Sequence, residues 1–157
     1  MKFLPITAFL TLGLSANTAI GVEISIQGPC DPAPWHQETV EAPLKTNFGK
    51  ITTDFLEFHA EPYEGSDHYI KSIRNSPVGD AALEIISDVE MKSYGWCFSI
   101  DGIVPASYPD EIEVTTGQET LSWFYAYSHY KSGEWISACV PSAPEAPAFL
   151  CKRSGNN

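Results

Sequence analysis

The stretch that decides the fold, residues 94–102, reads Tyr-Gly-Trp-Cys-Phe-Ser-Ile-Asp-Gly. Its apolar side chains Trp96, Phe98 and Ile100 stand at alternate positions, which predicts a strand with one buried face. The pair Asp101-Gly102 then favours a tight type I′ turn, because both residues tolerate a positive φ. This stretch locates a core, and by itself it indicates no chemistry.

Further strands are predicted on both sides of this stretch. Residues 22–28 alternate apolar and polar side chains and end in a Gly-Pro pair, which is typical of a half-buried strand. Residues 69–73 and 135–140 are also predicted strands, and residues 81–89 fit either a helical turn or a strand. In residues 121–127 the side chains alternate between two faces, and one face would carry Leu121, Trp123, Tyr125 and Tyr127.

A single helix is predicted at residues 50–60. Thr53 or Asp54 would cap it, Glu57 would complete a capping box with Asp54, and Pro62 would end it. A helix this short is marginal alone in water, so we expect it to pack on the sheet. Residues 29–43 are rich in proline and lack periodicity, which predicts a loop or an irregular arm. Together these elements indicate an α+β fold, a mixed sheet with one short covering helix and an added C-terminal hairpin.

The N-terminus predicts export. Residues 1–21 combine Lys2, a short apolar run and small residues, which is the pattern of a secretory signal peptide. The apolar run is about 12 residues long, whereas a membrane span needs roughly 20. We therefore expect a secreted or periplasmic protein that does not insert into the membrane after the signal is removed, with one domain at residues 22–140.

All four cysteines, Cys30, Cys97, Cys139 and Cys151, follow the predicted signal peptide, and an even number in an exported chain predicts disulfides. Three pairings are possible. We favour Cys97 with Cys139 and Cys30 with Cys151, because each pair then ties a strand to a later segment. Residues 141–157 would form an extended, proline-rich tail that Cys151 pins to the domain.

Charge and residue patterns exclude several classes of function. The formal net charge of −11 opposes binding to phosphate backbones and anionic membranes, so nucleic acid is a poor partner. No Gly-x-Ser-x-Gly motif is present, and the carboxylates at positions 110, 111 and 113 would be solvated. We therefore predict no catalytic residues and no enzymatic activity.

No metal site and no cofactor are predicted from the histidines. His36, His59, His68 and His129 lie in four separate segments, and no pair has the i, i+4 spacing of a zinc protease motif. His59 and His68 could meet Glu57 only if the intervening turn folds back. We expect His59 to stand at the end of the helix and to stabilise its terminal carbonyls.

Aromatic side chains are concentrated in a C-terminal hairpin, at residues 123, 124, 125, 127, 130 and 135. One helix cannot cover large residues on both faces of a hairpin, so one face is expected to be exposed. Tyr127, Tyr130 and Trp135 are the candidates for a ligand or partner surface, with Trp96 of the central strand as a fourth.

The motif at residues 95–102, Gly-Trp-Cys-Phe-Ser-Ile-Asp-Gly, resembles the Gly-Trp-x-Tyr-x-Val-Asn-Gly signature of the transcobalamin C-terminal-like family of small β-grasp domains. Residues 53–56, 69–73 and 117–125 resemble further family segments in the same order, so the likeness covers roughly residues 22–127. Phe98, Asp101 and Gln118 depart from the family pattern. The resemblance implies a β-grasp-like sheet and, from its eukaryotic relatives, one wall of a corrinoid site.

Compartment and resemblance together predict an exported, non-enzymatic binding or interaction module whose partner is an unknown protein or a small-molecule ligand. Two alternatives stay open. One is a small-ligand, corrinoid-type binding protein, and the other is a secreted inhibitor or effector directed at another protein.

Overall fold

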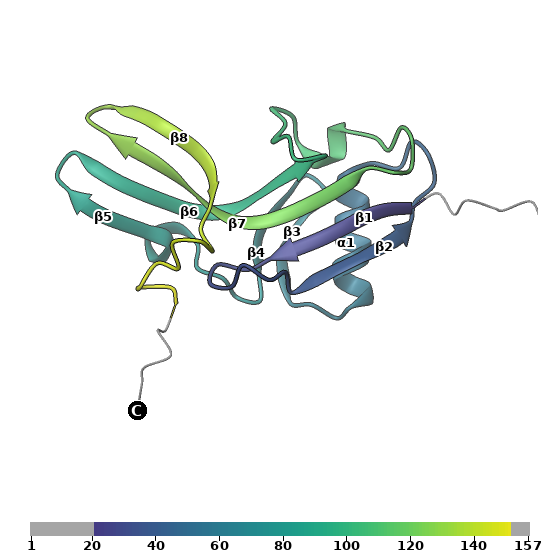
Figure 1. Ribbon diagram of the computed structural model, residues 1–157, viewed down its shortest axis with the longest axis horizontal. Coiled ribbons are helices and arrows are strands. Elements are labelled where there is room, and N and C mark those ends of the chain that lie inside the picture. The colour runs from purple at the N-terminus through teal and green to yellow at the C-terminus, as the bar shows by residue number, and fades with distance from the viewer. Residues whose placement is uncertain (1–20, 152–157) are drawn as a thin grey trace, which may run out of the picture.

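The computed structural model describes residues 21–151 and contains a six-stranded mixed sheet, a separate hairpin and one α-helix (Figure 1). The helix is α1 (Phe48–Phe58), and the hairpin pairs β3 (Tyr63–Ser66) with β4 (Tyr69–Ile73). The strands of the mixed sheet are β1 (Gly21–Gln27), β2 (His36–Glu41), β5 (Leu83–Ser87), β6 (Glu90–Ile100), β7 (Thr120–Lys131) and β8 (Glu134–Pro141). Apart from Gly21, which begins β1, the predicted signal peptide lies outside the described residues.

The strand order of the mixed sheet is β2-β1-β7-β6-β5, with β8 paired to the second half of β7. β1 runs parallel to β7, and all other neighbours in this sheet are antiparallel. A first hairpin, a helix that covers it and a later strand returning parallel to β1 make the fold β-grasp-like. The predicted class, with one short covering helix and an added C-terminal hairpin, is confirmed.

The longest pairing in the molecule joins β6 to β7, from Glu90 opposite Lys131 to Ile100 opposite Leu121. In Figure 1 these two strands run across the whole molecule, with β1, β2 and α1 at one end and β5 and β8 at the other. We call the end that contains β1, β2, α1 and the adjoining parts of β6 and β7 the body. We call the other end, residues 83–95 and 126–141, the wing.

The core of the body lies between α1 and the sheet. β1 contributes Val22, Ile24 and Ile26, all with no exposed surface, and α1 packs Phe48, Phe55 and Leu56 against them. The indole Nε1 of Trp123 donates a buried hydrogen bond of 2.8 Å to Thr52 Oγ1, and the Thr52 hydroxyl donates to the Phe48 carbonyl. A buried indole N–H needs such an acceptor, so this contact fixes how α1 sits on β7.

The helix begins earlier than the sequence predicts. Asn47, and not Thr53 or Asp54, is the N-cap, and its side-chain oxygen accepts a 2.7 Å hydrogen bond from the Lys50 amide. Gly49 lies in the first turn, and because glycine disfavours helices, the sequence of this turn does not indicate a helix. A Cβ there would lie 1.9 Å from the Asp67 carbonyl oxygen, so the close packing of the hairpin requires glycine at this position.

The prediction of a loop or irregular arm at residues 29–43 is wrong for its second half. β2 forms a regular antiparallel ladder with β1, from Gly21 opposite Glu41 to Ile26 opposite His36. Its residues are mostly polar because β2 is an edge strand, and only Val40 and His36 are partly covered. β2 therefore forms because its backbone pairs with β1, and its sequence has no apolar pattern that would predict a strand.

Two other local predictions are confirmed in part. Asp101 and Gly102 have φ values of 51° and 77°, as a type I′ turn requires, but the turn closes only the bridge between Ile100 and Ile103. The ambiguous stretch at residues 81–89 contains both alternatives, since a 3-10 turn at Gly79–Ala82 leads directly into β5.

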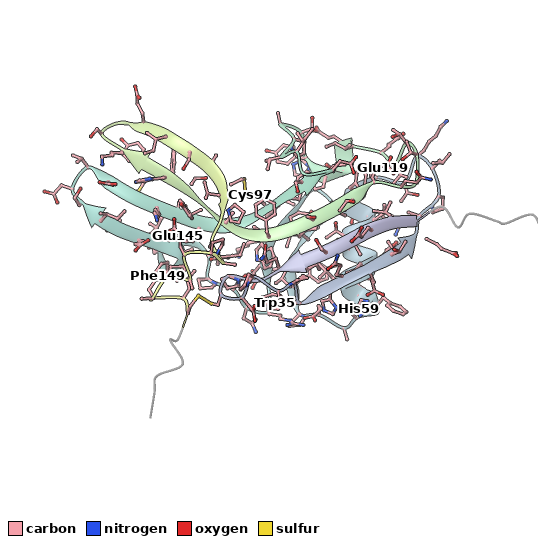
Figure 2. The ribbon with its side chains drawn as sticks, viewed as in Figure 1. Trp35, His59, Cys97, Glu119, Glu145 and Phe149 are labelled. Carbon is pink, nitrogen blue, oxygen red and sulfur yellow. A yellow bond between two sulfur atoms is a disulfide. The ribbon has the colours of Figure 1, made fainter. Side chains whose placement is uncertain are left out.

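Residues 141–151 of the tail fold back onto the wing in a series of turns, and this part is not extended as predicted. Glu145 accepts a 2.6 Å hydrogen bond from the Tyr127 hydroxyl and pairs at 2.6 Å with Lys92 (Figure 2). The ring of Phe149 lies edge-on to that of Tyr94, with centroids 5.2 Å apart. These contacts bury the tyrosines on one face of the wing, which stabilises the folded-back tail.

Both disulfides have the favoured pairing, Cys30 with Cys151 and Cys97 with Cys139. Cys97 lies near the junction of body and wing (Figure 2). Its disulfide with Cys139 links β6 to β8, and β7 lies between these two strands in the sheet. The Cys30 bridge fastens the end of the tail beside the end of β1. The two bridges thus hold the elements that α1 does not cover.

We expect peptide mapping of the oxidised protein to recover these two pairs. Replacing Cys97 and Cys139 together by alanine should lower the free energy of unfolding by about 4 kcal/mol, from the loop-closure entropy of their separation of 42 residues. Urea unfolding measures this loss, and the Cys30 and Cys151 double variant is the comparison. A loss below about 1 kcal/mol for both double variants would contradict a structural role for the bridges.

Glu119 organises the loop that leads into β7. Its carboxylate accepts hydrogen bonds from the amides of Thr115, Thr116 and Gln118, at 2.7 to 3.0 Å, and from the Thr115 hydroxyl at 2.8 Å. Burial acts to raise the pKa of Glu119, but the hydrogen bonds from Thr116 and Thr115 outweigh it and hold the pKa at about 2. The ionised form is therefore part of the folded structure.

A pKa lowered by folding stabilises the protein above the ordinary carboxyl value, and this stabilisation disappears as the pH falls toward 2. We expect Glu119→Gln to cost on the order of 2 kcal/mol at pH 7 and progressively less between pH 4.5 and pH 2. Urea unfolding of both proteins across this range measures the difference. If the two proteins differed by the same free energy of unfolding at pH 7 and at pH 2, the ionised Glu119 carboxylate would not be the source of the stabilisation.

Candidate functional site

Of the four aromatic residues predicted to form a binding surface, Tyr127 is buried, Trp96 and Tyr130 are half-buried and Trp135 is exposed. Trp96 packs in the junction of body and wing, where its Nε1 donates a 2.7 Å hydrogen bond to Ser76 Oγ and its ring lies 5.9 Å from that of Trp35. Tyr127 is only 8% exposed because the tail covers it. Tyr127 therefore contributes little to an exposed surface, whereas Trp96 remains half-buried.

Tyr130 and Trp135 do lie together on the wing, with ring centroids 5.4 Å apart in an edge-to-face arrangement. Trp135 is 55% exposed. The strand register extends this pair, because Ile85 stands opposite Met91, Met91 opposite Tyr130 and Tyr130 opposite Trp135. Directly opposed residues share a face of a sheet. We call this row of four apolar side chains across β5, β6, β7 and β8 the wing ladder.

The surroundings of the wing ladder are also apolar at its edges. Ile85 is 67% exposed, and further exposed apolar side chains follow at Ile86, Val89 and Ile136. A hollow of about 180 Å³ lies between the β5–β6 turn and Tyr130. Glu90, which lines this hollow together with Asp88, contacts His129 at 2.9 Å and Lys131 at 3.2 Å. The hydrogen bonds of His129 and Lys131 lower the pKa of Glu90.

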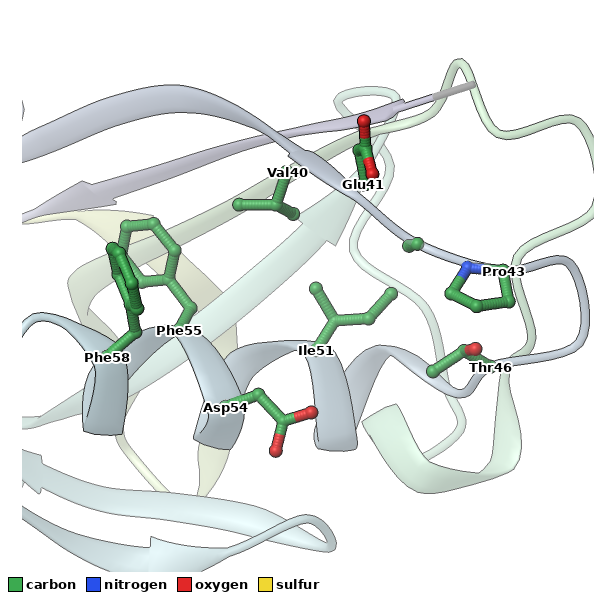
Figure 3. A pocket seen from close by; sticks show the side chains of 9 residues that line it. Val40, Glu41, Pro43, Thr46, Ile51, Asp54, Phe55 and Phe58 are labelled. Carbon is green, nitrogen blue, oxygen red and sulfur yellow. The ribbon is translucent and has the colours of Figure 1, made fainter. Parts of the chain in front are cut away.

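A second concave feature lies in the body, between α1 and the edge strand β2 (Figure 3). This groove has a volume of about 290 Å³, and Val40, Ile51, Phe55 and Phe58 supply most of its apolar lining. Phe58 is 83% exposed at the open end. The groove was not predicted, because the polar sequence of β2 does not indicate a strand.

Next to the groove, three side chains of metal-ligating type come together. His36 and Glu38 alternate on β2, and His59 follows the last residue of α1 as its C-cap. One ligand atom from each lies within 4.8 Å of the other two, and within residues 21–151 this is the one such group of three or more. His59 is at the helix end, as predicted, but its side chain contacts Glu38 and does not contact the terminal carbonyls.

Glu61 and Arg74 support this group of side chains. Glu61 lies 2.6 Å from His36 Nε2 and is paired with the Arg74 guanidinium. The hydrogen bond from Arg74 is the main cause that lowers the pKa of Glu61 to about 2, with His36 adding to it against the effect of burial. Arg74 also stacks on Trp35, with the guanidinium carbon 4.5 Å from the ring centroid.

The remaining histidines lie elsewhere in the molecule. His68 contacts Asp110 at 3.1 Å, and His129 contacts Glu90 on the wing. All four cysteines are in disulfides, so the part of the chain that the structure describes offers no thiol nucleophile. The turn does not bring His59 and His68 together with Glu57, since His59 meets Glu38 and His68 meets Asp110.

No family model, curated protein or solved structure matches the chain in the comparisons with known proteins. Among the described residues, the one α-helix has 11 residues, and none of the helices has the length and apolar character needed to cross a bilayer. The two disulfides are compatible with an oxidising compartment.

Proposed function

We propose that this chain is an exported, disulfide-bonded binding module without catalytic activity, and that it docks a partner protein through the wing ladder. The observation that carries the proposal is the exposure of Ile85 and Trp135 at the two ends of an apolar row crossing four strands. The predicted signal peptide at residues 1–21 and the two disulfides support export to a secreted or periplasmic location.

The composition of the wing ladder supports a protein partner. Monomeric proteins rarely expose contiguous apolar patches larger than a few hundred Å², and a larger patch with a polar rim is typical of an interface. Trp and Tyr are the residues most enriched among those that contribute strongly to protein binding, and Met is enriched at interfaces. Trp135, Tyr130 and Met91 bring all three types together, with the charged group around Glu90 nearby.

The charge of the chain disfavours other macromolecules. A net charge of −11 repels nucleic acid and anionic membranes. The secreted inhibitor or effector is the special case in which the docked partner is a foreign protein, and it would use the same surface.

The groove between α1 and β2 favours a second candidate function, the binding of a small ligand. Its volume of about 290 Å³ is just below the roughly 300 to 1,000 Å³ found for small-molecule sites. This size suits a compact apolar ligand better than a corrinoid. The resemblance to the transcobalamin C-terminal-like family remains a prediction.

The two candidate sites are distinguished by the matched variants Trp135→Ala and Phe58→Ala, which each remove one exposed aromatic side chain. The wild-type chain is cross-linked to its partners in the medium of the secreting cell. We expect Phe58→Ala to capture the same proteins and Trp135→Ala to lose them. With the isolated partner, Trp135→Ala should weaken binding tenfold or more, which is about 1.4 kcal/mol or above.

Stability measurements make the test interpretable. Because Trp135 is 55% exposed, its replacement should change the free energy of unfolding by less than about 1 kcal/mol. An unfolded Trp135→Ala protein would place this residue in the core, and unchanged partner binding would reject the wing ladder.

A thermal-shift series with cobalamin and a panel of metabolites tests the small-ligand candidate. A dose-dependent rise in melting temperature that Phe58→Ala removes and Trp135→Ala preserves would assign function to the groove. A flat response throughout the panel is the result expected from the proposal.

A further inference from the structure

Two elements that are distant in sequence place His36, Glu38 and His59 side by side. His36 and Glu38 are two residues apart on β2, so both project from the same face of the strand. His59 reaches them from the end of α1, and the centroids of the two imidazole rings are 4.7 Å apart. Ligand atoms around a tetrahedral zinc ion are roughly 3.4 Å from one another, so a separation within 4.8 Å needs only a small side-chain adjustment.

The contact between His59 and Glu38 lacks the geometry of a hydrogen bond. Nε2 of His59 is buried and makes no hydrogen bond within the described residues, although the Glu38 Oε1 oxygen lies 2.5 Å away. An unpaired buried ring nitrogen is costly. A cation bound between the nitrogen and the oxygen would take a lone pair from each and satisfy both, once the two atoms move apart to the roughly 3.4 Å of a tetrahedral site.

The rings are held in place by groups outside the cluster. Phe55 packs against both imidazoles, with centroid distances of 4.5 Å to His59 and 5.6 Å to His36. Glu61 contacts His36 Nε2 at 2.6 Å and is itself paired with Arg74. Carboxylates that orient a ligating imidazole in this way are a regular part of metal sites.

We propose that His36, Glu38 and His59 bind one Zn²⁺ ion. Two imidazoles and a carboxylate are a donor set that zinc prefers, and the acidic chain attracts cations. Three protein ligands leave a coordination position for water or for a group of a bound molecule. This site borders the groove, because Phe55 belongs to both, and it does not depend on the wing ladder.

The test is a calorimetric titration of the purified, oxidised protein with zinc chloride, and the visible spectrum of added Co²⁺ reports the ligand set. The wild-type protein should bind one equivalent. Glu38→Gln and His59→Gln should each weaken binding at least tenfold and alter the Co²⁺ spectrum. The matched control is His68→Gln, which removes a histidine that also faces a carboxylate but lies outside the cluster, and it should bind as the wild type does.

Glu38→Gln keeps the test decisive if His59→Gln folds poorly, because the Glu38 side chain is 42% exposed and the change preserves its shape. Melting curves without metal establish that each variant is folded. Absence of binding by the wild type at millimolar zinc overturns the proposal, and so does equal affinity in Glu38→Gln and His68→Gln. Trp135→Ala should bind zinc like the wild type, so this result is independent of partner docking.

Discussion

The fold depends on one constraint: β7 is much longer than α1, the only α-helix within residues 21–151 that covers it. β7 has 12 residues and spans about 40 Å, whereas the 11 residues of α1 span about 16 Å. The helix therefore covers the body alone, where Thr52 receives the hydrogen bond of Trp123. Over the wing, the folded-back tail covers one face through Glu145 and Phe149. The opposite face, which carries the wing ladder, has no cover within residues 21–151.

Local patterns predicted the parts of the fold in which side chains decide the structure. β1 shows its buried face as strict alternation, the second half of β6 alternates apolar and polar side chains in sequence, and Asp101-Gly102 marked a turn with positive φ. β7 has five consecutive buried residues from Trp123 to Tyr127, and its large apolar side chains marked it as a strand. β2 has little buried surface, so its polar residues carried no signal, and its formation depends on the neighbouring β1. The helix start was missed because Gly49 serves the packing of the hairpin and not the helix.

The candidate sites were only partly predictable for a related reason. Tyr130 and Trp135 stood out as large aromatic residues near the chain end, but their partners Ile85 and Met91 follow from strand register, which tertiary pairing sets. Tyr127 was misplaced because the course of the tail could not be derived from its prolines. The meeting of His36 with His59 required β2 to be known first, since that strand alone carries His36 to the end of α1.

The bridge between Cys30 and Cys151 also determines how the oxidised molecule carries mechanical load. A force applied between Gly21 and Cys151 passes along β1 and through the sulfur atoms, and the segment between the two cysteines, which are 121 positions apart, is bypassed. Only the ladders that join β1 to β2 and β7 bear the tension. The helix, the wing and the tail are shielded from pulling. Reduction of this one bond transfers the load to the helix, to β5 and the first half of β6, and to the tail, whereas the Cys97–Cys139 bridge still bypasses the residues between its two cysteines.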